Sequence, residues 1–522
     1  MMQLPWPAPR RRIAQVDTRR TGAPGLLALV LLACEALAGG CGGDRGLRFD
    51  PQAVARHRPL GGLDARFFLG VASSAHQTEG GNHNDWSAWE GGHFADGRPH
   101  IADGATATRA TDAWNRWPED VRAVQELGAN MYRLGIEWSR LEPTEGAWDE
   151  AAAAHYREVL TALATAKPQA VTPMLNLWHF TLPPWVAARG GWEWPGAPEA
   201  FAAFTGRAAA DFGDQVDWWC TLNEPNVYAA KAYLAAEWPP EVADPQRAAR
   251  VLAALVRAHG LAAAALRQHD RVDADGDGFA TRVGLAHSVR LFDPASAWSP
   301  LDRVVADAAD EFFNRAVVEA VARGELRVHL RGAVDLTMPA AELRGTFDYL
   351  GLNYYTRDLV SARLRGILGR GGQAGGRPFV TVAEPTHDRT DMDLEIYPEG
   401  LYRALKRFGA YGWPVLVTEN GMADRAGTRR PAFIRAHLFA LDRARAEGVP
   451  ILGYLYWSLT DNFEWALGYR GRYGLFAIDF EHDPTLARRP TPAVDTFREL
   501  AAGLGLHPAA RLATPPETGP TR

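Results

Sequence analysis

Val-Leu-Val-Thr-Glu-Asn-Gly, at residues 415–421, is the stretch that decides how we interpret this chain. Its first three apolar residues are typical of the end of a buried parallel strand. Glu419 comes where that strand should stop, and Asn420-Gly421 favours a turn. A parallel α/β barrel carries its chemistry at such strand ends, although one acid there can equally cap the next helix. The rest of the chain must therefore supply partners for Glu419.

Composition describes an ordinary globular protein. Of the 522 residues, 47% are hydrophobic and 23% are charged. The net charge of −6 gives no argument for nucleic acid as a partner. Three cysteines, Cys34, Cys41 and Cys220, form neither a disulfide framework nor a zinc pattern. The 18 tryptophans suit both core packing and stacking on sugar rings.

Short apolar runs alternate with alanine-rich helical patterns from residue 67 onward. The predicted strands are Phe67–Ala75, Ala129–Trp138, Ala170–Trp178, Val216–Thr221, Arg282–Leu291, Phe347–Tyr354, Pro414–Thr418 and Ile451–Ser458. The predicted helices are Trp117–Leu127, Glu150–Thr165, Pro198–Phe212, Pro245–Gln268, Leu301–Arg323, Pro398–Phe408 and Pro431–Glu447. This alternation predicts an α/β fold, a single (β/α)₈ TIM barrel.

The barrel is expected to span residues 63–505, after a linker at 42–62 and before a disordered tail at 506–522. Residues 1–41 resemble a signal peptide, with an arginine-rich start and a short apolar run. Small residues before Cys41 resemble a bacterial lipoprotein cleavage site, which favours export to the periplasm or cell surface and a lipid anchor on Cys41. A disordered arm or a misassigned start, with a cytoplasmic protein, is the alternative.

Two loops stand out between the predicted elements. The glycine-rich segment Arg363–Arg377 follows the sixth strand and is expected to cover the catalytic face as part of a lid. Asp273–Gly278 resembles the start of a calcium loop, with acids at Asp273, Asp275 and Asp277. The position that needs a bidentate glutamate is Gly284, so an acidic turn is favoured over a calcium site.

Glu224 is the partner that Glu419 requires. It lies in Thr-Leu-Asn-Glu-Pro at residues 221–225, directly after the fourth predicted strand. Acids on strands four and seven of one barrel can face each other across its mouth. Two carboxyl groups with separated pKa values are the machinery that cleaves glycosidic bonds, because one must donate a proton while the other stays ionised.

Several motifs in this order resemble glycoside hydrolase family 1, the β-glucosidase type. The resemblance covers roughly residues 63–505. Its motifs are Phe68–Gly80, Tyr132–Arg140, Thr221–Pro225, Gly351–Thr356, Val417–Gly421 and Trp457–Trp465. Each motif alone would be weak, but the ordered set is highly specific.

The resemblance implies a retaining mechanism without metal or organic cofactor. It assigns Glu419 as the nucleophile and Glu224 as the acid/base. Arg133 would keep Glu419 ionised, Tyr355 would hydrogen-bond the same carboxylate, and Asn223 would contact the sugar 2-hydroxyl. Taken without the resemblance, Arg133 would be an ordinary ion pair and Tyr355 a core tyrosine.

The resemblance also assigns the sugar pocket. Polar contacts to the sugar hydroxyls come from Gln77, His179 and Glu464, with Trp457 and Trp465 beside the ring. Many relatives carry tryptophan where this chain has Phe180, and phenylalanine where it has Tyr473.

The expected substrate is an unphosphorylated small-molecule or oligosaccharide β-glycoside. A glucoside is favoured, with fucosides and galactosides open, and the acid at Glu464 would repel a 6-phosphate. Two alternatives stay open: a catalytically silent sugar-binding lipoprotein, and a transglycosylase with the same residues.

Overall fold

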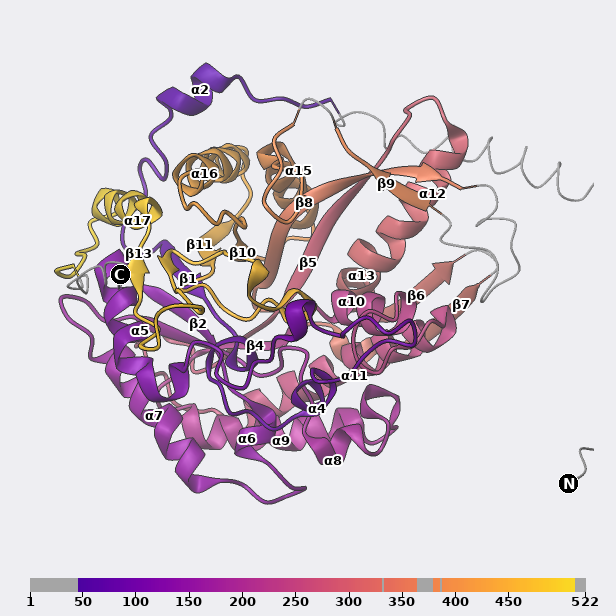
Figure 1. Cartoon of the computed structure of the whole chain (residues 1–522), viewed down its shortest axis with the longest axis horizontal. Coiled ribbons are helices and arrows are strands. Elements are labelled where there is room, and N and C mark those ends of the chain that lie inside the picture. The colour runs from indigo at the N-terminus through magenta and orange to yellow at the C-terminus, as the bar shows by residue number, and fades with distance from the viewer. Residues whose placement is uncertain (1–45, 331–332, 364–378, 385–386, 512–522) are drawn as a thin grey trace, which may run out of the picture.

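The computed structural model describes residues 46–330, 333–363, 379–384 and 387–511, and a closed ring of parallel strands lies at its centre (Figure 1). Neighbours along the chain pair in parallel, and β10 pairs with both β8 and β11, which closes the ring. The ring strands are β1 Phe68–Ala72, β2 Met131–Gly135, β3 Thr172–Asn176, β4 Trp218–Asn223, β5 Arg282–Pro294, β8 Leu350–Ala362, β10 Val415–Asn420 and β11 Ile451–Trp457. The predicted strands and the TIM barrel are confirmed.

The ring is apolar on both faces, as a helix-covered parallel sheet requires. Every residue of β2, β4 and β10 is buried. Side chains fill the inside of the ring, including Met131, Met174 and Trp218. Cys220 joins this inner cluster as a buried free thiol. Burial of each large apolar side chain contributes roughly 1.5–3 kcal/mol.

Helices surround the ring, and their ends follow local sequence signals. Asp149 accepts hydrogen bonds from the amides of Ala151 and Ala152, which starts α7, and the left-handed Gly128 ends α5. The surrounding helices are α5 Ala113–Leu127, α7 Glu150–Ala164, α9 Ala197–Phe212, α11 Pro245–His269, α12 Pro300–Asp310, α13 Ala316–Arg323, α15 Pro398–Gly409, α16 Arg430–Ala446 and α17 Pro492–Gly503.

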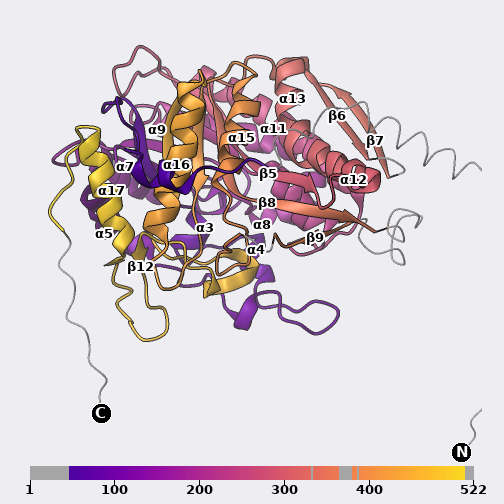
Figure 2. The same ribbon diagram turned by 90° about the horizontal axis from the view of Figure 1, so that it is seen from above.

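The region between β5 and β8 differs most from the sequence prediction. The single helix predicted over Leu301–Arg323 is two helices, α12 and α13, separated by the π-helical turn Glu311–Arg315. An unpredicted hairpin follows, β6 Glu325–Leu330 and β7 Val334–Pro339, and β9 Phe379–Val382 extends the sheet antiparallel to β8. Figures 1 and 2 place both additions on the same side of the barrel. The hairpin escaped prediction because few of its side chains are buried.

α11 is long and apolar enough to cross a membrane by length and composition alone, and 67% of its most apolar window is buried. It packs along α9 in the outer layer of the barrel, as the core helix of a globular domain does.

The segments flanking the barrel are described only in part. From residue 46, the predicted linker carries α2 Pro51–Arg56 and packs Phe49 and Leu60 on the barrel. Residues 506–511 of the predicted tail lie along α5, where the Ala509 amide donates to the carbonyl of Gln125. The signal-like segment 1–41, the glycine-rich segment after Arg363 and residues 512–522 lie outside the described residues.

Candidate active site

The two predicted catalytic acids lie at the same end of the barrel, which we call the mouth: the end where the ring strands finish. Glu419 is the penultimate residue of β10, and Glu224 directly follows β4. Both side chains are buried in this structure, with 3% of Glu419 and 9% of Glu224 exposed. The parallel direction of the strands brings both acids to this end, although 195 positions separate them in the sequence.

Glu419 holds the two partners that the sequence predicted. One carboxylate oxygen accepts a hydrogen bond from Nη1 of Arg133 at 2.5 Å, and the other accepts one from the Tyr355 hydroxyl at 2.6 Å. Arg133 is fully buried in β2, and its Nη2 donates to Asn223 at 2.6 Å. A buried pair of this kind stabilises the charged carboxylate only while both partners and their added hydrogen bonds are in place.

Glu224 has a different environment. No hydrogen bond joins it to a cation among the described residues, and Asn353 donates to its Oε1 at 3.0 Å. Burial, and then the charge of Glu419, raise the pKa of Glu224 to about 7. The two acids therefore differ in the way that acid/base work requires: one carries a cation partner and the other keeps its proton near neutral pH.

The backbone at Glu224 is strained. Its φ of 45° lies in the left-handed region, which costs a non-glycine residue roughly 1–3 kcal/mol. The Glu224 amide donates to the Ala286 carbonyl at 2.7 Å, and Pro225 starts the short helix α10 Pro225–Tyr228 immediately afterwards. These two constraints turn the chain sharply at the strand end and hold the carboxyl group over the mouth.

Asn353 is a site residue to which the sequence gave no role. Thr418 donates from its hydroxyl to Oδ1 of Asn353 at 2.6 Å, which turns the amide nitrogen toward Glu224 and Asn223. In the register of β8 and β10, Asn353 stands opposite Glu419. The signal was present, because Asn353 lies in the motif Gly351–Thr356 at a strand end.

A third acid, Glu464, faces the same space together with Gln77. Gln77 donates to Oε2 of Glu464 at 3.3 Å and to Asn462 at 3.2 Å, while Ser74 donates to its carbonyl oxygen. Burial, followed by the charges of Glu419 and Glu224, raises the pKa of Glu464 to about 8. The carboxyl group of Glu464 can therefore both donate a hydrogen bond to a hydroxyl group and accept one from it.

Aromatic rings and His179 complete the wall. The ring of His179 stacks on Trp457 and Trp465, with both centroids 5.8 Å away. Its Nε2 lies 3.0 Å from Nδ2 of Asn223, and burial holds its pKa well below the ordinary value. Phe180 packs on Trp465 through ring contact alone. Every side chain predicted for the site is thus placed at the mouth.

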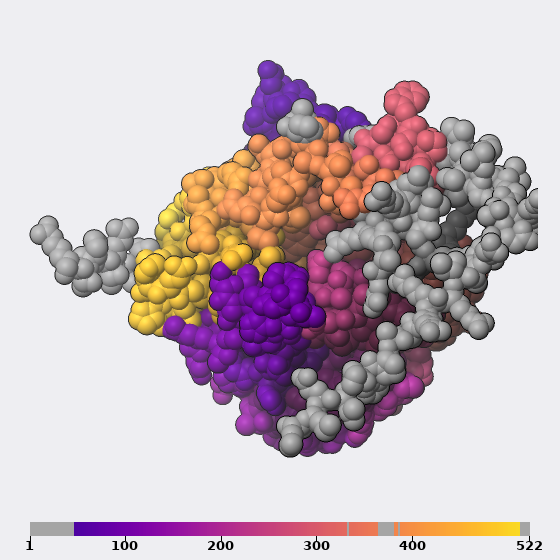
Figure 3. All heavy atoms as spheres, turned by 45° about the vertical axis from the view of Figure 1, so that its right-hand side comes forward, coloured from indigo at the N-terminus to yellow at the C-terminus, as the bar shows by residue number. Residues whose placement is uncertain are grey.

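Distant parts of the chain build this face. In Figure 3 the purple segment from near residue 100 lies beside the yellow C-terminal segment. An ion pair of 2.6 Å between Asp103 and Arg470 joins the two.

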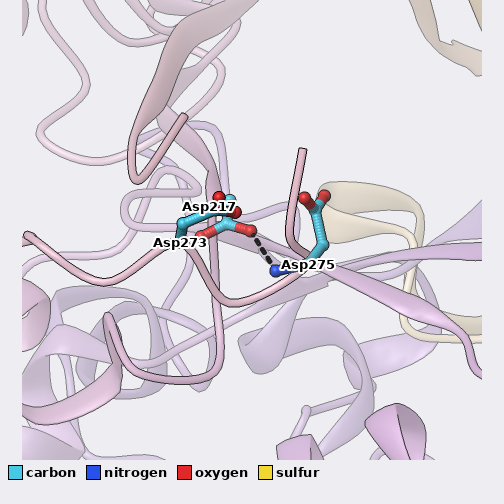
Figure 4. A group of neighbouring side chains, drawn as sticks. All are labelled: Asp217, Asp273 and Asp275. Atoms are coloured by element: carbon cyan, nitrogen blue, oxygen red, sulfur yellow. Dashed lines mark hydrogen bonds between the residues drawn. The ribbon is translucent and has the colours of Figure 1, made fainter. Parts of the chain in front are cut away.

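The acidic turn lies away from the mouth, before the start of β5. Carboxylate oxygens of Asp217, Asp273 and Asp275 lie within 4.8 Å of one another (Figure 4). The chain's own amides bind two of these acids: those of Ala274 and Asp275 donate to Asp217, and those of residues 276–278 donate to Asp273. Gly284 offers no side chain to complete a calcium loop, so the geometry favours the acidic turn.

A (β/α)₈ barrel whose mouth holds two buried acids in unlike environments has the arrangement with which glycoside hydrolases cleave glycosidic bonds.

Comparisons with known proteins give the family. The model of glycosyl hydrolase family 1 matches residues 61–505. The chain is 30% identical to a beta-galactosidase of Pyrococcus woesei, over 84% of this chain and 97% of that protein. It is also 30% identical to beta-glucosidase A of Thermotoga maritima, over 79% of this chain and 92% of that protein. The solved beta-glycosidase from Pyrococcus horikoshii superposes with a TM-score of 0.74 at 32% identity, over 86% of this chain and 96% of that one. This chain belongs to glycosyl hydrolase family 1, a family of retaining β-glycosidases.

Proposed function

We propose that this protein hydrolyses unphosphorylated β-glycosides, with β-glucosides as the preferred class, and that Glu419 and Glu224 carry the reaction. The observation that supports this best is the contrast between the two acids. Glu419 is bound by a cation and a hydroxyl group, whereas the pKa of Glu224 is raised to about 7. The first is suited to attack as an anion, and the second is suited to donate a proton.

The reaction takes place in two displacements. In the first, a Glu419 oxygen attacks the anomeric carbon while the Glu224 carboxyl gives its proton to the leaving oxygen, so that a glycosyl ester forms and the aglycone departs. In the second, the Glu224 carboxylate takes a proton from water, the water oxygen attacks the anomeric carbon, and Glu419 leaves. Two inversions give net retention.

The surrounding residues position the sugar in this proposal. Asn223 is held by Arg133 and lies beside His179, which suits it to hydrogen-bond the 2-hydroxyl as charge develops at the anomeric carbon. Gln77 and Glu464 bind hydroxyls farther round the ring, and the Trp457 and Trp465 rings flank its apolar face. The acid at Glu464 disfavours a 6-phosphate, because it offers the phosphate no positive charge and adds a negative one as it ionises near pH 8.

The glycone is the finer part of the proposal. Relatives named beta-galactosidase and beta-glucosidase match this chain at the same 30% identity. The two sugars differ in the orientation of the 4-hydroxyl, which the Gln77–Glu464 pair would contact. A matched series of p-nitrophenyl β-glucoside, β-galactoside, β-fucoside and 6-phospho-β-glucoside tests this directly. A higher kcat/KM for the glucoside is expected, and turnover of the phosphorylated substrate would contradict the proposal.

Proton NMR of the first-formed sugar tests the mechanism, and a β-anomer is expected. Tight sugar binding without turnover would instead identify a silent sugar-binding protein. Transfer to an added sugar that outruns release to water would identify a transglycosylase.

We also propose export and attachment through Cys41, on the basis of the sequence of residues 1–41. Fractionation of cells that express the full chain, compared with a Cys41→Ala variant, tests this. Membrane association of the wild type alone is expected, and an identical soluble distribution would reject the anchor.

A further inference from the structure

An ion pair beside Glu224 has no part in the chemistry proposed so far. Arg290 of β5 donates from Nη1 to Oδ2 of Asp358 of β8 at 3.1 Å. The backbone of Arg290 is fixed as well, because its amide donates to Asn314 and its carbonyl accepts from the same side chain. The guanidinium is thus carried on a rigid strand and not on a loop.

The position of Arg290 along β5 directs it toward the acid/base. Ala286 accepts the hydrogen bond of the Glu224 amide, and Ser288 lies two residues further along the same strand. The register with β8 shifts between Val289 and Leu291, so Arg290 lies at an irregularity, a feature that re-aims a side chain next to a site. Ser288 lies close enough to Glu224 for its hydroxyl to lower the pKa of that carboxyl. Asp358 and, after it, Glu224 and Tyr473 raise the pKa of Arg290, which agrees with a guanidinium on the Glu224 side of the wall.

Exposure separates this pair from the other buried charges of the barrel. The side chain of Arg290 is 36% exposed and that of Asp358 is 16% exposed, whereas Arg133 is fully buried. A guanidinium carries five N–H donors, and the bond to Asp358 uses one nitrogen. Arg290 and Asp358 together therefore present hydrogen-bond donors and an acceptor, side by side, to a ligand that approaches from solvent.

The reaction places the leaving group there. The acid/base gives its proton to the leaving oxygen, so groups beyond Glu224 face the aglycone, while Gln77, His179 and Glu464 face the glycone. The pair carries no net charge, which argues against an anionic aglycone as its ligand. Neighbouring hydroxyls of a pyranose both accept and donate, as the pair requires, whereas an alkyl or aryl aglycone would desolvate the charges without replacing their hydrogen bonds.

We propose that Arg290 and Asp358 bind a sugar in the leaving-group position and so direct the enzyme toward di- and oligosaccharide β-glycosides. This inference rests on the proposed function and names the aglycone of the same site.

The test compares two substrates that share a glycone. For a glucosidase these are cellobiose and p-nitrophenyl β-glucoside, and for a galactosidase lactose and p-nitrophenyl β-galactoside; glucose is the leaving group of both disaccharides. With Arg290→Gln, kcat/KM for the disaccharide should fall about 10- to 100-fold, the usual size for a hydrogen bond to a charged group. For the aryl glycoside it should change less than about threefold.

Two further variants separate binding from folding. Arg257→Gln is the matched control, because the pair of Arg257 with Glu199 joins α11 and α9 outside the ring, and the exposure of Arg257 is similar to that of Arg290. This variant should change kcat/KM for neither substrate. Arg290→Lys keeps the charge but not the planar fork, so it should restore the disaccharide rate only in part. Circular dichroism and Tm establish that each variant is folded.

Equal losses on both substrates, or no loss on either, would overturn the inference while leaving the proposed function in place. A wild-type enzyme that turns over neither aryl glycoside would overturn the proposed function, and this inference with it.

Discussion

Two groups of three acids in the described part of the barrel can be compared: the acids at the mouth and those of the acidic turn, of which the first is suited to chemistry. At the mouth, Glu224, Glu419 and Glu464 come from three separate segments of the chain. In the acidic turn, Asp273 and Asp275 are neighbours, and Asp217 lies just before β4. The turn acids are mostly exposed and accept hydrogen bonds from nearby amides, whereas the mouth acids are partly or fully buried and have long-range partners.

The difference shows how a carboxylate becomes reactive. In the turn, nearby amides donate to Asp217 and Asp273, so local donors offset part of the cost of their charge, although burial still raises the pKa of Asp217 to about 6. At the mouth, the other acids and the low dielectric oppose the charge of Glu224 and Glu464, and the rest of the fold must hold them there. The closeness of acids to one another therefore says little about their reactivity. Whether their partners are local or come from distant strands says more.

The largest expected effect is the loss of the proposed nucleophile. Glu419→Ala should lower kcat about 10⁴-fold or more, because no group is left to form the glycosyl ester. Added azide should restore turnover and give an α-glycosyl azide, identified by NMR. Asp275→Ala, the matched change in the acidic turn, should alter kcat less than about twofold. A kcat near that of the wild type in Glu419→Ala would contradict the assignment of Glu419 as the nucleophile.

The next effect is on the pH dependence. Because the pKa of Glu224 is raised to about 7, its acid form is lost as the pH rises through that value. Log kcat/KM for a glycoside with a poor leaving group should therefore fall with a slope near −1 above about pH 7. Glu224→Gln should lack this limb for the same glycoside and lose most of its rate, but it should still form the glycosyl ester from a 2,4-dinitrophenyl glycoside, which needs no proton. An unchanged limb in that variant would assign the titration to another group.

Glu464 should affect the free energy of unfolding. Its pKa is about 8 in the folded protein, against 4.5 for the unfolded chain, so at intermediate pH the folded state holds a proton that the unfolded state has released. Wild-type stability should therefore fall as the pH rises from about 5 to 8, and Glu464→Gln should lose that dependence. In urea unfolding, the free energy of unfolding of the variant relative to that of the wild type should rise by on the order of 1–3 kcal/mol between about pH 5 and pH 8. If the free energies of unfolding of the variant and the wild type differ by the same amount at both pH values, the raised pKa of Glu464 is contradicted.

The smallest effect is expected in the acidic turn. Asp273→Asn weakens the acceptor of the amides of Gly276, Asp277 and Gly278, which should cost about 1 kcal/mol or less and leave kcat/KM unchanged. Differential scanning calorimetry with millimolar calcium or with a chelator should give the same Tm for the wild type. A rise in Tm with calcium that Asp273→Asn abolishes would make the turn a metal site after all.

The fold was predictable because its signals are local. Each ring strand is a short apolar run, and residues such as Asp149 and Gly128 mark helix ends within a few positions. Glu224 and Glu419 were predictable because each follows a buried run. The β6–β7 hairpin was not predicted, although its apolar residues alternate and Gly332 lies between its two strands in the sequence, because each strand is short and buries few side chains. The role of Asn353 was missed because Thr418, which orients its amide, lies on another strand.

The sequence by itself determined the barrel, the family motifs and the identity of the two acids, because strand patterns and strand-end residues are written in consecutive positions. The family resemblance assigned the roles of the two acids, but only the tertiary structure showed the physical cause of their difference and the pairing of Arg290 with Asp358. Those properties depend on burial and on charges contributed by different strands. Such interactions exist only after the ring has closed.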